Sequence, residues 1–375
     1  MSAPHPAARR TRLHALPGRL RQSLFDGPAA TLATVLIALA AAWLAPALLR
    51  WALIDAVWTA DADACRAAAG ACWGMIGEKY RAILFGRYPY DAQWRPLLAT
   101  AVLLAALLAT LRLPARTGQA GHLRRTGPAL LAGWAIAAAL FGVLMGGGVA
   151  GLEAVPTELW GGLPLTLLLA LGGIASAFPL AVLLALGRTA PLPAIQAPCA
   201  AYIELIRSVP LVPALFLASF LVPLLLPTER EVDVLLRVQV AITAFAAAYL
   251  AEAIRGALLA VPAGQRQAAA ALGLGWWQTQ RHVLLPQALR AAAPSIANSF
   301  INLFKDTSLV VVVGLYELTG ALDLALAGDP QWRPYQLEGY VFIGALYWVG
   351  CFALSRASRR LEGPHAAQAP RPSLR

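Results

Sequence analysis

Charged residues are scarce in this sequence of 375 residues, and their scarcity decides the broad class of the protein. Only 13% of the residues are charged and 59% are hydrophobic, whereas soluble globular chains carry about 25% charged and about 45–50% apolar residues. A soluble fold of this composition would expose large apolar patches to water. The composition therefore excludes an ordinary soluble protein and favours one that lies in a lipid bilayer.

The sequence also lacks the ten-residue segments of alternating hydrophobicity that are typical of transmembrane β-barrels. Its apolar residues form long unbroken runs instead, and a run of about 20 such residues crosses the hydrocarbon layer as a helix. We expect an all-α integral membrane protein with about eight transmembrane helices. Pro210, Pro213 and Pro223 predict a kink in the fifth run. The candidate spans are Pro28–Leu49, Pro96–Leu111, Pro128–Val149, Gly162–Leu186, Ala200–Leu226, Val238–Leu259, Ser295–Leu315 and Tyr340–Ser358.

Motifs for catalysis and nucleotide binding are missing as well. No GxxxxGK[ST] phosphate-binding loop occurs, so any energy from ATP must come from another chain. The five histidines have no metal-ligand spacing and lie in loops or tails. The sequence therefore predicts no metal or cofactor in this chain and gives little support to a membrane-embedded enzyme. The histidines are His5, His14, His122, His282 and His365.

Acidic residues are outnumbered by basic ones, 19 to 30, and the formal net charge is +11. With eight crossings, arginine-rich tails and loops alternate with loops that carry acidic residues, and this bias predicts that both termini are cytoplasmic. The loop 50–95 is an exception, because it carries several basic residues on the predicted outer side. A nucleic-acid partner is disfavoured, since the arginines lie at the ends of spans and form no single stripe with stacking aromatic residues.

Cysteines number only four. Cys199 and Cys351 lie in or near apolar runs, where a thiol acts as a small hydrophobic group. Cys65 and Cys72 lie in the outer loop, where an oxidising compartment permits a disulfide that closes a short loop. Two unpaired thiols are the alternative.

Changes in composition divide the chain into four parts. Residues 1–27 and 361–375 are basic, proline-rich tails, which we expect to be disordered. Residues 28–155 hold three spans and the outer loop, and residues 156–360 hold five spans. A glycine-rich stretch followed by Pro156 suggests a linker between these two blocks.

The loop between the sixth and seventh spans, residues 260–290 (the inner loop), has its own helical pattern. Pro262 and Gly264 predict a turn, and Gln265–Leu272 an alanine-rich helix. Gly273 follows at the position where a left-handed conformation ends a helix without a Cβ clash. We expect a second short helix that stops near Pro286. A helix with small residues on its face lets another backbone approach closely, so the inner loop is suited to docking with a cytoplasmic partner.

The inner loop resembles the coupling loop of bacterial ABC-importer permeases, whose pattern is Glu-Ala-Ala, three residues, Gly, nine residues and Ile-x-Leu-Pro. The flanks AAYLAEAIRGAL, LPQALRAAAP and NLFKDTSLV are similar to the polar amino acid branch of these permeases, and residues 159–360 share the resemblance. The longer N-terminal part looks like that of general L-amino acid permeases. Gln267 departs from the pattern, since it lacks the negative charge of the usual Glu. The ATPase-coupling residues that the resemblance implies are Gly264, Gln267, Ala268, Ala269, Gly273, Val283, Leu285 and Pro286.

The resemblance implies a type I ABC-importer permease core of five helices with an N-terminal three-helix extension, in the inner membrane of a bacterial cell. It implies that the chain is a transport subunit rather than an enzyme and forms half of an amino-acid pathway. The implied partners are a second permease, either a related chain or a copy, a cytoplasmic ATPase dimer that holds ATP and Mg²⁺, and a periplasmic amino-acid-binding protein. Which amino acids are carried is left open.

Charged and polar residues inside the apolar runs are candidates for the pathway or for contacts between helices, because an unpaired charge there is costly. Lys305 and Asp306 either face the solute or form an ion pair with Glu252, with Arg255 or with the partner permease. Polar side chains nearby can bond between helices or line a cavity. We also expect Glu204 and Arg207 to form a structural pair or an interface. The remaining polar candidates are Asn298, Ser299, Thr307 and Ser308.

Two other classes of membrane protein are alternatives to the importer. An ion-coupled secondary transporter of small polar solutes would have paired broken helices in two related halves, and five core spans do not divide evenly. A membrane-embedded enzyme would have a nucleophile and base or a metal cluster at membrane depth. ATP-dependent uptake, uptake driven by an ion gradient, or turnover by the isolated chain would separate the three.

Overall fold

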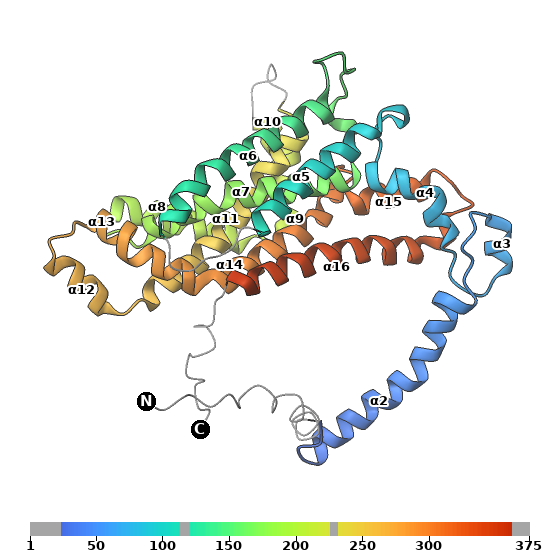
Figure 1. The fold of residues 1–375 in the computed structure, drawn as a ribbon, viewed down its shortest axis with the longest axis horizontal. Helices are drawn as coiled ribbons and strands as arrows, with labels where there is room; N and C mark the ends of the chain where they lie inside the picture. Colours follow the sequence, from blue (N-terminus) through green and yellow to red (C-terminus); the bar gives the residue numbers. More distant parts are fainter. Residues whose placement is uncertain (1–23, 113–119, 226–231, 362–375) are drawn as a thin grey trace, which may run out of the picture. The chain divides into compact units, whose positions relative to one another are not determined.

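The computed structural model describes residues 24–112, 120–225 and 232–361, and these residues form an all-helical protein without a β-strand (Figure 1). Seven helical segments of the described residues are long and apolar enough to cross a membrane, and a bent pair of helices supplies an eighth if it counts as one span. This agrees with the predicted fold class. The seven segments are Pro28–Ile54, Tyr90–Arg112, Gly127–Gly146, Gly162–Arg188, Val234–Ala260, Trp276–Val313 and Arg333–Arg359.

The fifth predicted span, Ala200–Leu226, is broken rather than merely kinked. Helix α8 (Pro193–Ser208) and the segment Leu211–Leu225 meet at an angle of 108°. The break falls at Val209, whose backbone is extended (φ −105°, ψ 131°). Pro210 causes this, because the proline ring disfavours helical geometry in the residue before it.

The chain divides into two compact units, Met1–Gly77 and Glu78–Arg375. The first contains α2 (Pro28–Leu49), which continues through the π-helical turn Arg50–Ile54, and the short helix α3 (Ala62–Ala67). The side chains of α2 are almost all exposed, and its mean hydropathy is that of a lipid-facing span. Helix α4 (Gly74–Phe85) begins in this unit and continues into the second.

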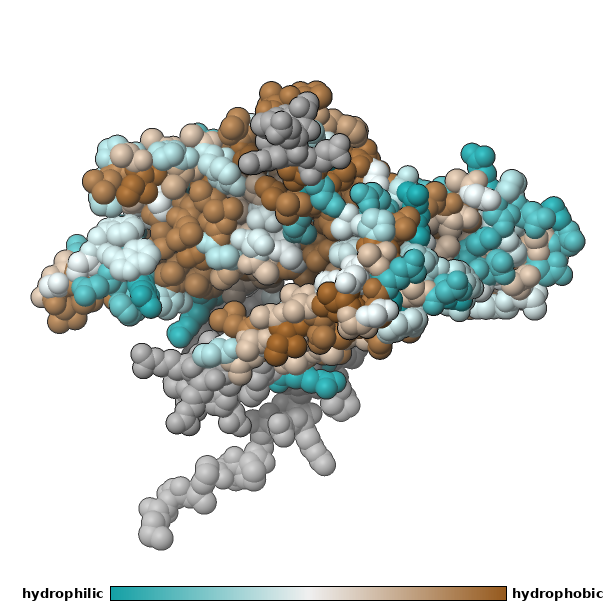
Figure 2. Space-filling view, turned by 90° about the horizontal axis from the view of Figure 1, so that it is seen from above, coloured by the Kyte–Doolittle hydropathy of each residue, from teal (hydrophilic) through white to brown (hydrophobic). Residues whose placement is uncertain are grey.

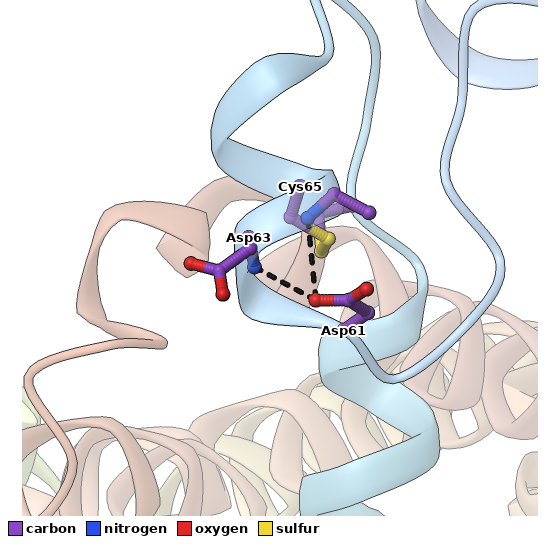
Figure 3. Close-up of a disulfide and its surroundings, with 5 residues drawn as sticks. Asp61, Asp63 and Cys65 are labelled. Atoms are coloured by element: carbon purple, nitrogen blue, oxygen red, sulfur yellow. Dashed lines mark hydrogen bonds between the residues drawn. A yellow bond between two sulfur atoms is a disulfide. The ribbon is translucent and has the colours of Figure 1, made fainter.

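A disulfide closes the loop after α2. Cys65 and Cys72 are bonded, with their Cα atoms 5.5 Å apart, and both side chains are buried. Asp61 caps α3 by accepting from the amide of Asp63 at 2.9 Å, and the amide of Cys65 donates to the Asp61 carbonyl (Figure 3). Trp73 packs against the rings of two further tryptophans beside this loop. The unit therefore holds its folded loop with one covalent bond and a small aromatic cluster.

The second unit is a helical bundle built around α11 (Val234–Ala260). This helix packs against α7 (Gly162–Arg188), α8 and α14 (Leu285–Asp306), and α14 also contacts α16 (Gln336–Leu361). Alanines dominate the buried contact between these helices, and small side chains let helix axes approach closely. They are Ala177, Ala181, Ala185, Ala247, Ala251, Ala288 and Ala292.

Short elements connect the helices of the bundle at its two ends. Helices α12 (Ala263–Ala271) and α13 (Trp276–Thr279) lie at one end, and α15 (Leu318–Ala327) lies towards the other (Figure 1). Apolar side chains cover much of the visible face of the bundle between these ends (Figure 2). Leu97, Leu183 and Trp348 are among the exposed large apolar side chains of the bundle, as expected for a bundle that is surrounded by lipid. The other short segments include α9 (Leu211–Phe216), η4 (Leu217–Leu221), α10 (Val222–Leu225), η5 (Gln280–Leu284) and η6 (Thr307–Val313).

Helices α5 (Trp94–Arg112) and α6 (Ala120–Gly146) form a pair, and α5 also packs on α7 of the core. The buried side chain of Arg95 donates to the carbonyls of Leu144 at 2.7 Å and Glu153 at 2.8 Å. Tyr88 donates to the Met145 carbonyl at 3.0 Å. These donors satisfy the free carbonyls at the end of α6. Burial raises the pKa of Tyr88, against a smaller lowering effect of the nearby Arg95 charge.

The start of α7 is packed too tightly for any side chain. Gly162 has φ +62°, and a Cβ atom there would lie 2.1 Å from the carbonyl oxygen of Leu84. Its amide donates to the Tyr316 carbonyl at 2.8 Å. The turn after α4, the start of α7 and the segment before α15 therefore meet at one point. The predicted ranges 28–155 and 156–360 stay predictions, although α5 and α6 share a compact unit with the core.

An ion pair between Lys79 and Asp329 joins α4 to the segment after α15 and makes stability depend on pH. The two side chains are 2.7 Å apart and 18% and 30% exposed. The hydrogen bond from Lys79 lowers the pKa of the Asp329 carboxyl. A lowered pKa stabilises the folded state above the ordinary carboxyl pKa, and the effect is lost as the pH falls through the lowered value. We expect Asp329→Asn to lower the thermal unfolding midpoint at pH 7, and this difference to vanish in acid. A difference that is the same at every pH would contradict this.

Candidate functional site

The inner loop leaves the bundle as a well-formed helix whose surface is mostly exposed. Helix α12 runs from Ala263 to Ala271, two residues earlier than predicted at its start. Gly264, Gln267 and Ala268 are exposed, whereas the Ala269 side chain is buried. The opening triplet of the motif therefore presents two of its three residues outward.

Gly273 ends α12 in a left-handed conformation, with φ +74°. The amide of Gly273 donates to the Ala270 carbonyl at 2.9 Å, and the amide of Leu274 donates to the Ala269 carbonyl at 3.1 Å. This pair of bonds is the Schellman arrangement, in which glycine avoids the strain that a Cβ would cause. The motif glycine thus sets the direction in which the chain leaves α12.

Exposed apolar side chains cluster beside this turn. Leu272 is 80% exposed, Trp277 is 53% exposed and Trp276 is 39% exposed. The two indole rings stack with centroids 6.2 Å apart. Aromatic and leucine side chains of this exposure at the tip of a loop are typical of a surface that a protein partner covers.

The second helix of the inner loop does not stop near Pro286, contrary to the prediction. Helix α13 continues through the π-helical turn η5 directly into α14, and Pro286 lies in the first turn of α14. The π-helical turn η5 interrupts the regular i→i−4 hydrogen-bond ladder just before Pro286, so a residue without an N–H is tolerated there. Val283 and Leu285 pack against the buried core of the bundle. The second half of the inner loop is therefore continuous with the span that follows it, over Trp276–Val313.

Charged residues gather where α7, α8 and α11 end, close to the inner loop. The Glu252 carboxylate lies 3.1 Å from Arg188, 3.0 Å from Arg255 and 3.9 Å from Arg207. Arg188 also binds Glu204 at 2.7 Å. Glu252 thus holds three helices together by a charge network, in which each carboxylate–guanidinium contact is a charge-assisted hydrogen bond or ion pair.

This network changes two predicted pairings. Glu204 pairs with Arg188 rather than with Arg207, and the Arg207 guanidinium lies over the ring of Tyr249 at 5.3 Å. Glu252 and Arg255 pair with each other and not with Lys305 or Asp306. Among the described residues, no ion pair includes Lys305 or Asp306. Of the predicted alternatives for these two residues, the solute and the partner permease stay open.

Helix α14 has one buried apolar face and one exposed polar face. Ala288, Ala292, Ile296, Leu303 and Phe304 are buried. A span that faces lipid exposes apolar side chains, so an exposed polar face indicates a water-filled pathway or another subunit. The exposed polar residues of α14 are Gln287, Arg290, Ser295, Asn298, Asn302 and Lys305.

A cavity of about 270 Å³ lies beside the end of this polar face. Lys305 and Ser308 line it from α14 and η6, Thr319 from α15, and Tyr340 and Tyr347 from α16. The Thr307 hydroxyl lies behind the residues that line the cavity and is 3.4 Å from the Tyr347 hydroxyl. An ammonium group and several hydroxyls around one cavity can bind an anionic or polar group of a solute.

Three residues at or near these sites could not be identified as functional candidates from the sequence pattern. Arg188 is the last residue of an apolar run and looked like a boundary charge. Glu317 lies between spans in the sequence but is fully buried. In the sequence, Tyr347 is not distinguishable from an aromatic residue at a membrane interface. Only the partners that folding places beside them reveal their roles.

Comparisons with known proteins identify the family of this chain. The family described as "Binding-protein-dependent transport system inner membrane component" matches residues 177–363. The "Inner membrane amino-acid ABC transporter permease protein YhdY" of Escherichia coli (strain K12) is 42% identical, over 85% of this chain and 84% of that protein. The "Glutamate/glutamine/aspartate/asparagine transport system permease protein BztC" of Rhodobacter capsulatus is 36% identical, over 92% of each chain.

A solved structure is also similar. The protein described as "Crystal structure of an amino acid ABC transporter with histidines" shares 27% sequence identity with this chain. The match covers 52% of this chain and 89% of that chain, with a TM-score of 0.47. The relatives above match most of their own length, and their descriptions name transport components rather than enzymes. This chain therefore belongs to the amino-acid permeases of ABC transporters and is a multi-pass membrane transport subunit.

Proposed function

We propose that the chain forms half of the translocation pathway of an ATP-driven amino-acid importer and couples that pathway to a cytoplasmic ATPase. One observation carries the proposal: the second half of the inner loop, from Trp276 onward, and the polar face of α14 belong to one continuous helical segment, Trp276–Val313. A partner that displaces the inner loop therefore pulls directly on the helix that carries Asn298, Asn302 and Lys305. Such a rigid link lets an event at the loop change which pathway conformation is favoured.

The proposed partners follow from what this chain has and lacks. It has no phosphate-binding loop for ATP, so an ATPase dimer with ATP and Mg²⁺ supplies the energy. The family description names binding-protein-dependent transport, which supports delivery by a periplasmic amino-acid-binding protein. The polar face of α14, exposed in a single chain, supports a second permease, either a relative or a copy, across the pathway.

We propose polar L-amino acids as the solutes. The name of one relative specifies glutamate, glutamine, aspartate and asparagine, and a cavity with Lys305 and four hydroxyl-bearing residues matches the carboxylate that every amino acid carries. The distribution of basic residues supports a topology in a bacterial inner membrane with both termini and the inner loop in the cytoplasm and the disulfide loop in the periplasm. Oxidising conditions there suit the Cys65–Cys72 bond.

Reconstitution tests the proposal. The purified permease is placed in vesicles with its ATPase, second permease and binding protein, and uptake of labelled amino acids is measured with ATP and with a nonhydrolysable analogue. We expect uptake only with hydrolysable ATP and with the binding protein present. Uptake that needs an ion gradient and ignores ATP would support the alternative, an ion-coupled secondary transporter, and would overturn the proposal.

A further inference from the structure

Glu317 is a fully buried carboxylate just before α15. Its side chain accepts hydrogen bonds from the Tyr347 hydroxyl at 2.6 Å and from the amides of Thr319 at 2.7 Å and Gly320 at 3.4 Å. The Thr166 hydroxyl lies 3.2 Å away. No ion pair of the described residues includes Glu317. Hydrogen-bond donors rather than an opposite charge therefore satisfy this carboxylate.

The carboxylate joins three helices at one point. Tyr347 comes from α16 and Thr166 from α7, and the two amides are the free N–H groups at the start of α15. The Thr166 hydroxyl also accepts from the amide of Leu318 at 3.2 Å. Because the start of a helix carries a partial positive charge, a carboxylate there is stabilised and fixes the direction of α15. The tight backbone contact of Gly162 with Tyr316 lies in the same place.

Two of the groups that Glu317 binds form part of the cavity wall. Tyr347 and Thr319 line the cavity together with Lys305 and Tyr340. Glu317 does not line it. It lies behind the wall and holds the Tyr347 hydroxyl from that side. Removing it would free the hydroxyl to take other positions and would leave the amides of α15 unsatisfied.

We propose that Glu317 is the positioning residue of this cavity: by holding the Tyr347 hydroxyl and the start of α15, it sets the affinity and selectivity with which the permease binds its solute. The inference rests on the proposed function, because it takes the cavity to be part of the amino-acid pathway. Glu317 acts through Tyr347 and Thr319 and does not itself touch the solute. A tyrosine with a fixed hydroxyl discriminates between solutes better than a freely rotating one, since the unpaired polar group penalises a poorly matching ligand.

The test measures binding of labelled glutamine, glutamate and asparagine to the detergent-purified transporter complex without the binding protein. We expect Tyr347→Phe and Glu317→Ala to weaken binding about fivefold to tenfold, the factor expected for one lost hydrogen bond, and to change the ratio of affinities between the amino acids. Glu317→Gln still accepts from the amides and can bond to Tyr347, so it should restore most of the affinity. Glu158→Gln, at an exposed glutamate before α7, is the matched control and should bind as the unchanged protein does.

The possible outcomes distinguish a failure of the positioning role from a failure of the proposed function. If the unchanged complex binds and transports amino acids but Tyr347→Phe retains its affinity and selectivity, the positioning role is wrong while the proposed function stands. If the unchanged complex shows no ATP-dependent uptake, the proposed function itself fails. If the complex with Glu317→Ala does not assemble, Tyr347→Phe alone tests the positioning role, because it removes one hydroxyl and leaves the ring in place. A loss of thermal stability in the variants with unchanged affinity would show a merely structural role and overturn the proposal.

Discussion

Replacing Leu272 with aspartate should abolish most co-purification of the ATPase while the permease itself stays folded. Leu272 is 80% exposed at the end of α12, next to the turn made by Gly273. Burying one such side chain in an interface contributes about 1.5–3 kcal/mol, and a buried unpaired carboxylate adds a further penalty. The affinity for the ATPase should therefore fall at least about tenfold. The measurement is the amount of ATPase retained by immobilised permease, together with ATP-dependent uptake.

A second leucine provides the matched control. Leu192 is 59% exposed in the turn between α7 and α8, outside the inner loop. Leu192→Asp introduces the same charge at a similar exposure, and we expect it to retain the ATPase. Equal losses in both variants would show that a general effect of charge, and not docking through the inner loop, explains the result. Retention of the ATPase by Leu272→Asp would contradict the coupling role of this surface.

Glu252→Ala should be the most destabilising single substitution of a charged residue in the network at the ends of α7, α8 and α11. The change leaves Arg188 and Arg255 without the carboxylate that they share, and their side chains are only 19% and 27% exposed. Breaking a buried pair on one side costs about 3–5 kcal/mol because an uncompensated charge stays behind. Partial exposure here places the expected loss near the lower end, about 3 kcal/mol. Chemical or thermal unfolding of the detergent-solubilised protein measures it.

The network contains its own control. Glu204 binds the same arginine, Arg188, but its side chain is 67% exposed. An exposed pair contributes about 0–1 kcal/mol, so Glu204→Ala should change the free energy of unfolding far less than Glu252→Ala. Similar losses in the two variants would mean that burial does not decide the strength of these pairs. Adding Arg255→Ala to Glu252→Ala should recover part of the stability, since Arg255 pairs with Glu252 alone among the described residues and is left unpaired without it.

Under the proposed function, the position of the Glu252 network bears on transport as well as on stability. Arg255 lies eight positions before Ala263, where α12 begins, on the helix that leads into the inner loop. A displacement of α12 therefore reaches Glu252 through α11, while α14 carries the displacement on the other side of the loop. Both helices that border the inner loop thus connect it to charged or polar groups inside the bundle.

Local features of the chain could be predicted from the sequence where a single residue type or a single apolar run determines the local structure. The apolar runs identified the membrane spans, because crossing the hydrocarbon layer requires a stretch of about 20 apolar residues whatever the neighbours are. Gly273 ends α12 as expected, because only glycine adopts the left-handed conformation without strain. Pro210 predicted a kink, but the angle of 108° depends on how the two halves pack against other helices.

Boundaries inside the inner loop were less predictable. Pro286 was expected to stop a helix, and a proline does so within a helix interior. The π-helical turn Gln280–Leu284 interrupts the regular α-helical hydrogen-bond ladder just before it, so the helix continues past this proline. The turn buries Leu284 in the core of the bundle, so tertiary packing and not local preference determines the continuity of the inner loop with α14.

By itself the sequence determined the membrane location, the number and rough bounds of the spans, and the family-like pattern of the inner loop, because these depend on composition and on spacing along the chain. The tertiary structure alone decided which charges pair and which stay free. Arg188 and Glu252 are 64 positions apart, and Thr166 and Glu317 are 151 apart. No periodicity within one helix encodes such contacts, since they arise only when helices pack side by side. The same packing leaves Lys305 without a partner carboxylate among the described residues and places it at the cavity.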